Sequence, residues 1–264
     1  MLIEISYDDK GNKKTKIVYD DGSISVKHDS GSNVTNIGSQ FDKETKIATV
    51  LNSKIYLPNY KVDLIQGCIA RGTYFDLNHL KKMSKYLNED SVVIDCGANI
   101  GNHTLYFANE CNVRKIYAFE PVPTTYKILQ KNIKLNNLEN VVEAKNIGLS
   151  NEISKGAIES YNLSNIGGTR LCKMDNGDID FLTIDSLNIK EKIDLIKIDV
   201  EGMDYLVLQG AENTIRKNMP VINIESFESE YKQSKVFLSE LGYELAEELS
   251  ICEYIYIPAK NKKS

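Results

Sequence analysis

The sequence predicts an α/β fold in which helices cover a mostly parallel β-sheet. From residue 91 onward, short apolar runs alternate with stretches of helical periodicity, a pattern typical of a parallel sheet covered on both faces. A glycine-containing turn follows the first of these runs, at the position where open α/β sheets bind their ligands. The last two runs, YELAEEL and CEYIYIPAK, are expected to close the sheet as an antiparallel hairpin.

Length and composition restrict the class of protein. The 264 residues suit one large domain or one domain with an appendage, and the net charge of −5 disfavours nucleic acid as the main partner. The five cysteines lack the spacing of zinc ligands, and no run reaches the roughly 20 apolar residues of a membrane span. The first residues also lack the apolar segment of a signal peptide. We therefore expect a cytoplasmic protein with reduced thiols.

Residues 1–75 are expected to form a small β-rich extension, with the main domain at 76–264. Asp21-Gly22 lies between two alternating runs, which is a strong signal for a β-hairpin, and the segment from Asp8 to Gly11 predicts a second, weaker turn. The extension is expected either to cover a pocket or to build a homo-oligomer, and the sequence does not decide between these roles.

The main domain is expected to begin with a helix over 76–88, in which Leu77, Leu80, Met83 and Leu87 share one face and Asp76 is the N-cap. Apolar runs then predict strands at 91–97, 115–121, 141–150, 194–202 and 220–227. Helical patterns lie between them at 102–111, 124–137, 203–218 and 229–242. The stretch 151–180 is expected to be irregular.

The segment VVIDCGANIG at 92–101 predicts a nucleotide-binding turn. A dinucleotide site needs the glycine spacing G-x-G-x-x-G to hold a pyrophosphate, but Gly97 and Gly101 are spaced G-x-x-x-G. Asp95 precedes them and would repel a pyrophosphate. S-adenosylmethionine (SAM) carries no phosphate and has a cationic sulfonium and ammonium. The turn therefore favours SAM over a dinucleotide, and a methyltransferase over a dehydrogenase.

Two residues at later strand ends are candidates for the rest of the cofactor. Glu120 ends the next strand, 19 positions beyond Gly101, and an acid about 20 residues after such a turn binds a ribose diol. Glu120 fits a dinucleotide as well as SAM. Asn146, at the end of the third strand, is expected either to flank an adenine or to serve only the turn.

By these residues the chain resembles the FkbM family of SAM-dependent methyltransferases. The matching segments are VVIDCGANIGNHTLYFA (92–108), YAFEPVP (117–123), NIGLS (146–150), NIGGTRL (165–171), IDLIKIDVEGMDYLVLQGA (193–211) and PVINIES (220–226). The resemblance implies a Rossmann-like class I methyltransferase sheet of seven strands, with one antiparallel strand near the C-terminus. It also implies methyl transfer to a hydroxyl, commonly of a sugar or a natural product.

Carried over by position, the resemblance assigns the cofactor contacts. Glu120 holds the ribose, and the residues around the first turn wrap the methionine part. The residues carried over for the methionine part are Asp95, Gly97, Asn99 and Gly101. Asn102, Thr104 and Pro121 are expected as further cofactor contacts.

Carboxylates at the fourth and fifth strand ends are the candidates for the chemistry. Asp199 and Glu201 follow the run IKI, and Glu225 follows VINI. One interpretation makes Asp199 or Glu201 the general base for the acceptor hydroxyl. The other, partly by analogy with some sugar O-methyltransferases, has Asp199, Glu201 and Glu225 hold Mg²⁺, a cation that prefers oxygen ligands.

Two further side chains have both a functional and an ordinary interpretation. His103 opens the first helix beside the cofactor turn, where a neutral imidazole is a candidate base, although packing or capping explains it equally well. Arg170 lies in a glycine-rich stretch and is a candidate clamp for an acceptor phosphate or carboxylate, or simply a solvated loop residue.

The sequence as a whole predicts an O-methyltransferase acting on a small molecule, foremost a sugar or a nucleotide- or lipid-linked glycan precursor. Two alternatives remain: a natural-product O-methyltransferase, and a non-catalytic interaction protein that kept the SAM fold. A nucleic-acid methyltransferase is disfavoured, because the N/D-P-P-Y/F motif and a Pro-Cys nucleophile are both missing.

Overall fold

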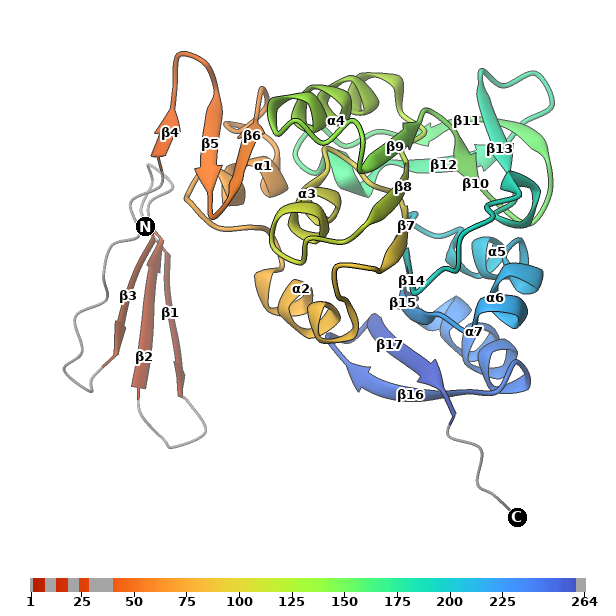
Figure 1. Ribbon diagram of the computed structural model, residues 1–264. Helices are drawn as coiled ribbons and strands as arrows, with labels where there is room; N and C mark the ends of the chain where they lie inside the picture. Colours follow the sequence, from red (N-terminus) through yellow and green to blue (C-terminus); the bar gives the residue numbers. More distant parts are fainter. Residues whose placement is uncertain (1, 8–12, 19–23, 29–39, 260–264) are drawn as a thin grey trace.

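A seven-stranded sheet forms the centre of the molecule. The computed structural model describes residues 2–7, 13–18, 24–28 and 40–259 (Figure 1). The strand order of the central sheet is β16-β17-β15-β14-β7-β8-β9. Its parallel strands are β7 (Val92–Cys96), β8 (Lys115–Phe119), β9 (Val142–Lys145), β14 (Leu195–Ile198) and β15 (Val221–Glu225). β17 (Glu253–Pro258) is antiparallel to both β15 and β16 (Tyr243–Glu248). The expected sheet, with its closing antiparallel hairpin, is confirmed.

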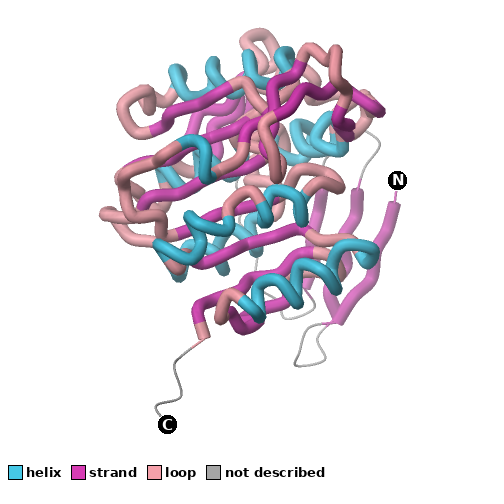
Figure 2. The backbone as a smooth tube through the Cα atoms, turned by 90° about the vertical axis from the view of Figure 1, so that its right-hand side faces the viewer, coloured by secondary structure: helices cyan, strands magenta, loops and turns pink. Residues whose placement is uncertain are grey.

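Helices cover both faces of this sheet (Figure 2). α3 (Asn102–Asn109) and α4 (Pro123–Leu135) bury Leu105 and Leu129 in one core, which Val93 of β7 joins. The second core takes Ile94 from β7 and Val207 from α5 (Asp204–Gln209), together with side chains of α6 (Glu212–Asn218) and α7 (Glu228–Glu240). Successive residues of β7 thus serve opposite cores, as alternation along a strand requires.

The helix expected over 76–88 is present, but its predicted cap is wrong. α2 spans Leu77–Met83 and continues as a 3₁₀ turn over Ser84–Tyr86. Asp76 occupies the N-cap position with φ at 52°, and its side chain makes no capping hydrogen bond. In this left-handed conformation the Asp76 side chain lines the cavity described below.

The single helix expected over 203–218 is wrong, because it divides into α5 and α6 between Gln209 and Glu212. Gly210 lies at the break, and a side chain there would overlap the backbone carbonyl oxygen of Ser150. The close approach of this backbone to the segment after β9 ends the first helix.

The stretch 151–180 was expected to be irregular, but it contributes to a second sheet. This sheet consists of β10 (Gly148–Leu149), β13 (Ile179–Leu182), β11 (Ser154–Ser160) and β12 (Arg170–Lys173), in that order. Phe181 fills the space above Gly148 and Gly156. Much of β11 is exposed, and its sequence lacks the regular apolar alternation that would predict a strand.

The N-terminal segment has the expected β-structure. β1 (Leu2–Tyr7), β2 (Lys13–Val18) and β3 (Ile24–His28) form an antiparallel three-stranded sheet. The two predicted turns, at Asp21-Gly22 and from Asp8 to Gly11, lie outside the described residues.

Residues 40–75 pack into the core of the main domain, across the boundary predicted at residue 75. β4 (Gln40–Asp42), β5 (Ile47–Val50) and β6 (Ser53–Tyr56) form a small antiparallel sheet, and α1 (Leu64–Ile69) follows it. The side chain of Asn132 in α4 accepts a hydrogen bond from the Tyr56 amide at 2.7 Å. Ile55 and Leu57 are fully buried in the core of α3 and α4. Helices of the described chain are all too short or too polar to cross a membrane.

Candidate active site

The described residues form a cavity at the carboxyl ends of β7, β8, β14 and β15. The turn after β7 contributes Gly97 and Asn99, and the end of β8 contributes Glu120 and Pro121. Ile65 of α1 and residues of the second sheet, among them Leu149 and Phe181, also line the cavity. It therefore lies where open α/β sheets bind cofactors, as the sequence predicted.

The turn after β7 fits only because residue 97 is glycine. Gly97 has φ at 77°, and a side chain there would overlap the backbone carbonyl oxygen of Asp199. The amides of Gly97 and Ala98 donate to the Phe119 carbonyl at 3.0 and 2.9 Å. Gly101 has φ at 97° and packs against Leu129. The turn is thus held between β8, β14 and α4, with its backbone exposed to the cavity at Gly97.

Several predicted cofactor contacts face the protein interior instead of the cavity. Asp95 is fully buried, accepts a hydrogen bond from the Thr104 hydroxyl at 2.6 Å, and lies 3.4 Å from the Lys197 ammonium. The Asn102 side chain binds the backbone amide and carbonyl of Phe75, each at 3.0 Å. None of Asp95, Asn102 and Thr104 lines the cavity. These side chains support the turn from inside, so a direct contact with the cofactor does not fit their positions.

Glu120 lines the cavity and is almost fully buried, with 6% of its surface exposed. Its carboxylate accepts hydrogen bonds from the amides of Asn99 and Val122, both at 2.9 Å. Burial raises its pKa to about 7, although these two hydrogen bonds oppose the shift. A ligand hydroxyl beside this carboxylate would satisfy its remaining acceptor capacity.

Asn146 is not where the adenine prediction placed it. Its side-chain nitrogen donates to the backbone carbonyls of Glu120 and Pro121, at 2.8 and 2.9 Å. The residue is exposed and does not line the cavity, whereas Ile147 and Leu149 do. Asn146 therefore serves the turn that carries Glu120.

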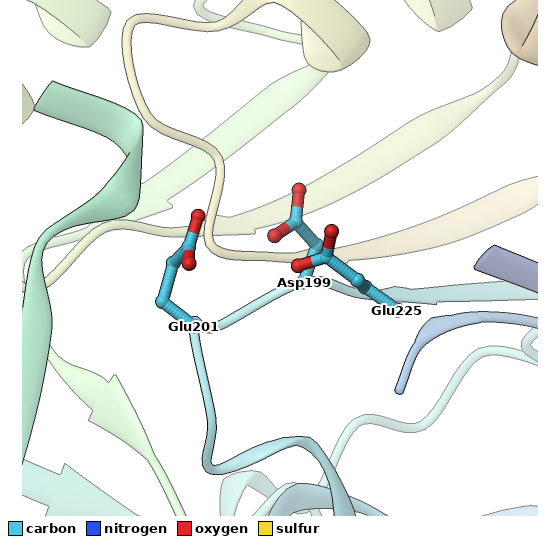
Figure 3. A group of neighbouring side chains, drawn as sticks. All are labelled: Asp199, Glu201 and Glu225. Carbon is cyan, nitrogen blue, oxygen red and sulfur yellow. The ribbon is translucent and has the colours of Figure 1, made fainter. Parts of the chain in front are cut away.

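Three carboxylates converge at the other end of the cavity (Figure 3). Asp199 follows β14, Glu201 lies two residues on, and Glu225 ends β15; one carboxylate oxygen of each lies within 4.8 Å of the others. Glu201 has φ at 59°, which turns the chain beyond Asp199. Burial, together with the charge of Asp199, raises the pKa of Glu201 to about 7 and that of Glu225 to about 8.

Lys197 lies beneath this group, 3.2 Å from Asp199 and 3% exposed. Burial alone would lower its pKa, but the charges of Asp199 and Asp95 raise it above its ordinary value. The lysine is therefore a buried positive charge between the cofactor turn and the acidic end of the cavity.

The acidic group also fits a divalent cation. Glu225 has a buried carboxylate oxygen that no described residue hydrogen-bonds. Oxygen ligands of this kind suit Mg²⁺, and a cation would relieve the repulsion that raises the pKa of Glu201 and Glu225.

His103 lines the cavity, but its environment does not suit a general base. Burial, reinforced by the charge of Lys197, lowers its pKa to about 3. A base with so low a pKa holds a proton poorly near neutrality, since efficient general bases titrate near the working pH. So low a pKa favours the neutral imidazole and does not support the proposed base role.

Arg170 is exposed at the start of β12 and does not line the cavity. The positive charge of Arg170 acts to lower the pKa of Glu201, but the larger effect of burial raises it. An acceptor clamp inside the cavity therefore does not fit its position.

Sequence reasoning missed two further carboxylates of the cavity, Asp76 and Glu253. Glu253 pairs in register with Glu225 across β15 and β17, and its side chain contacts His79 at 2.5 Å. The register of an antiparallel hairpin brings them together, and no motif marks them. Neither lysine nor arginine lines the cavity within the described chain, so the end of the cavity around Asp199 is acidic.

The sheet order, the glycine turn and the carboxylate after β8 together define a SAM-dependent methyltransferase. Residues 95–255, more than half of the chain, match the family described as the Methyltransferase FkbM domain. The chain belongs to this family.

The chain is also similar to individual methyltransferases. Methyltransferase 1 of Beauveria bassiana is 27% identical over 188 residues, which cover 61% of this chain and 75% of that protein. Hexuronic acid methyltransferase AglP of Haloferax volcanii is 32% identical over 145 residues, covering 52% of this chain and 57% of that one. The crystal structure of methyltransferase FkbM from Methylobacillus flagellatus has a TM-score of 0.49 at 19% identity, covering 65% of this chain and 44% of that chain.

Proposed function

We propose that the protein transfers the methyl group of SAM to a hydroxyl of a small acceptor, a sugar or a sugar-bearing precursor. The observation that carries the proposal is the position of the Asp199 carboxylate in the same cavity as Glu120, directly beyond the turn at Gly97. A methyl donor in that turn and a proton acceptor at Asp199 would face each other across the cavity.

The cofactor half of the cavity suits SAM in shape and charge. Glu120 would accept hydrogen bonds from the ribose hydroxyls, and Ile147 and Leu149 would pack against the adenine. The exposed backbone at Gly97 and Asn99 would contact the methionine part. Bound SAM would supply a methyl group activated by its positively charged sulfur, and S-adenosylhomocysteine, with a neutral thioether, would be the leaving group.

The acceptor hydroxyl is a weak nucleophile, so it must lose its proton as the new carbon–oxygen bond forms. Asp199 is the base we propose, with 37% of its side chain exposed at the cavity wall. The proton would pass from the acceptor oxygen to a carboxylate oxygen of Asp199. Glu201 and Glu225 have raised pKa values, so near neutrality a fraction of each is protonated and can donate a hydrogen bond to the acceptor.

A metal-assisted form of the same reaction uses the same residues. Asp199, Glu201 and Glu225 would hold Mg²⁺, which would lower the pKa of a hydroxyl bound beside it. A chelator separates the two forms, because it stops only the metal-assisted reaction.

A neutral or amino sugar fits the cavity better than an anionic one. Asp76, Glu225 and Glu253 face the acceptor end, and no cationic side chain of the described residues lines it. Hydroxyl groups donate readily to carboxylates, whereas a phosphate or uronate would be repelled unless a metal intervenes. This preference separates the proposed acceptor from the hexuronic acid in the name of the Haloferax volcanii relative.

The test is a screen of sugars and sugar-bearing precursors with labelled SAM, with and without chelator. Labelled product from a hydroxyl-bearing neutral sugar is the expected result. Transfer only to nitrogen or carbon acceptors would contradict the proposal.

A further inference from the structure

Lys197 is a buried residue that the proposed chemistry does not use directly. It lies on β14, between Asp95 of β7 and Asn223 of β15 in the sheet register. A lysine in this position is costly, because a buried ammonium loses its hydration unless charged and polar partners replace it. The groups that contact the Lys197 ammonium therefore indicate its role.

The Lys197 ammonium contacts both functional halves of the cavity. On the cofactor side, it donates to the backbone carbonyl of Gly97 at 2.9 Å and to that of Cys96 at 3.3 Å, and it lies 3.4 Å from Asp95. On the other side, it lies 3.2 Å from a carboxylate oxygen of Asp199. One charged group thus joins the cofactor turn to the proposed base.

This arrangement restricts the Asp199 side chain. Asp199 is partly exposed, and no other cation within the described residues forms an ion pair with it. A charge-assisted contact to one carboxylate oxygen fixes the orientation of the group and leaves the second oxygen free. Because the Lys197 ammonium is itself held by two backbone carbonyls of the turn, the orientation of Asp199 follows that of the turn.

We propose that Lys197 is a positioning residue that ties the Asp199 carboxylate to the cofactor turn and so fixes the base relative to the methyl donor. The catalytic part of this inference rests on the proposed function of Asp199. The structural part, that Lys197 sets the orientation of Asp199 and of the turn, does not.

The first test is structural. Lys197→Met removes the charge and keeps most of the length of the side chain, but it leaves Asp95 buried without its cation. Asp95→Asn/Lys197→Met removes both charges and keeps an oxygen for Thr104, so it serves if the single variant does not fold. Two pairs of crystal structures make the comparison: Lys197→Met against wild type, and the double variant against Asp95→Asn. In each pair, the protein without Lys197 should show the Asp199 carboxylate turned away from its position in the reference protein. An unchanged Asp199 rotamer and an unchanged turn at Gly97 would overturn the proposal.

The second test is kinetic and uses the same pairs. We expect kcat to fall by about 10- to 100-fold, the size of loss that misplaced groups cause, while KM for the acceptor stays within about three-fold. Lys197→Met should cost little more in an Asp199→Asn background, since the lysine acts through that carboxylate. Equal losses with and without Asp199 would overturn the positioning role.

Lys192→Met is the matched control, because Lys192 is 74% exposed and forms an ion pair with Asp194 at the surface. It should leave kcat and the Asp199 orientation unchanged. If wild-type protein transfers no methyl group to any acceptor, the proposed function fails, and the crystal structures still decide whether Lys197 orients Asp199. If wild type is active and Lys197→Met is equally active, the positioning proposal alone fails.

Discussion

The backbone carbonyl oxygen of Asp199 occupies the space that a side chain on Gly97 would need. The turn after β7 and the end of β14 are therefore in direct backbone contact, where the cofactor and the proposed base must meet. The Asp199 amide also donates to the Cys96 carbonyl at 3.2 Å. This contact makes the cofactor turn and the acidic group parts of one site.

Gly97→Ala should abolish binding of S-adenosylhomocysteine. A side chain at this left-handed position costs about 1–2 kcal/mol by itself, and here it must also displace the Asp199 backbone. Gly242→Ala is the matched control, because Gly242 has φ at 85° and no atom near the added carbon. The control variant should lose some stability but keep the wild-type affinity for S-adenosylhomocysteine in a calorimetric titration. Equal affinity in both variants would contradict the packing argument.

Asp199→Asn should lower kcat by about 100-fold to 10,000-fold, the usual contribution of a positioned base. Affinity for S-adenosylhomocysteine should change only a few-fold, because the Asp199 side chain faces the acceptor end. Rates with a saturating acceptor check the first expectation and calorimetry the second. A variant that turns over at the wild-type rate would exclude Asp199 as the base.

The free protein should become less stable as the pH rises from about 6.5 to about 8.5. Burial raises the pKa of Glu120, Glu201 and Asp204 to about 7 and that of Glu225 to about 8. A raised carboxyl pKa means that the folded state binds more protons than the unfolded state. Its stabilising effect is complete below the unfolded pKa and is lost as the pH passes the folded value.

His103 does not reverse this trend, because its pKa is lowered to about 3 and it is neutral in both states above about pH 6.5. Thermal unfolding at both pH values measures the effect, and each ~1 kcal/mol lost lowers Tm by about 2–4 °C. A Tm that rises over this range would show that the carboxyl group pKa values are not raised.

Mg²⁺ should raise Tm at alkaline pH if the acidic group holds it, because a ligand that binds only the folded state stabilises it. Glu225→Gln should remove the increase, since it takes away one of the three converging carboxylates. Glu143→Gln is the control, because Glu143 forms an exposed ion pair with Lys145. This variant should keep the increase in Tm that Mg²⁺ causes. A Tm that is independent of Mg²⁺, with activity that survives chelation, would leave Asp199 as an unassisted base.

Sequence reasoning predicted the sheet and the convergence of Asp199 with Glu225, because both follow apolar runs whose ends meet at one edge of a parallel sheet. It did not anticipate that Asp95 and Thr104 face the interior, since a motif gives positions along the chain and not the direction of a side chain. Asp76 and Glu253 reach the cavity through a left-handed residue and a hairpin register, and neither leaves a periodic signal. The packing of residues 40–75 on α4 depends on asparagine–backbone contacts that composition does not reveal.

The most direct measurement is a calorimetric titration of the protein with S-adenosylhomocysteine, with NAD as the comparison ligand and Glu120→Ala as the variant. The account predicts micromolar binding of S-adenosylhomocysteine, no binding of NAD, and binding at least about ten-fold weaker in Glu120→Ala, a loss of about 1.4 kcal/mol. Absence of S-adenosylhomocysteine binding, or binding that does not depend on Glu120, would contradict the assignment of this cavity as the site of methyl transfer.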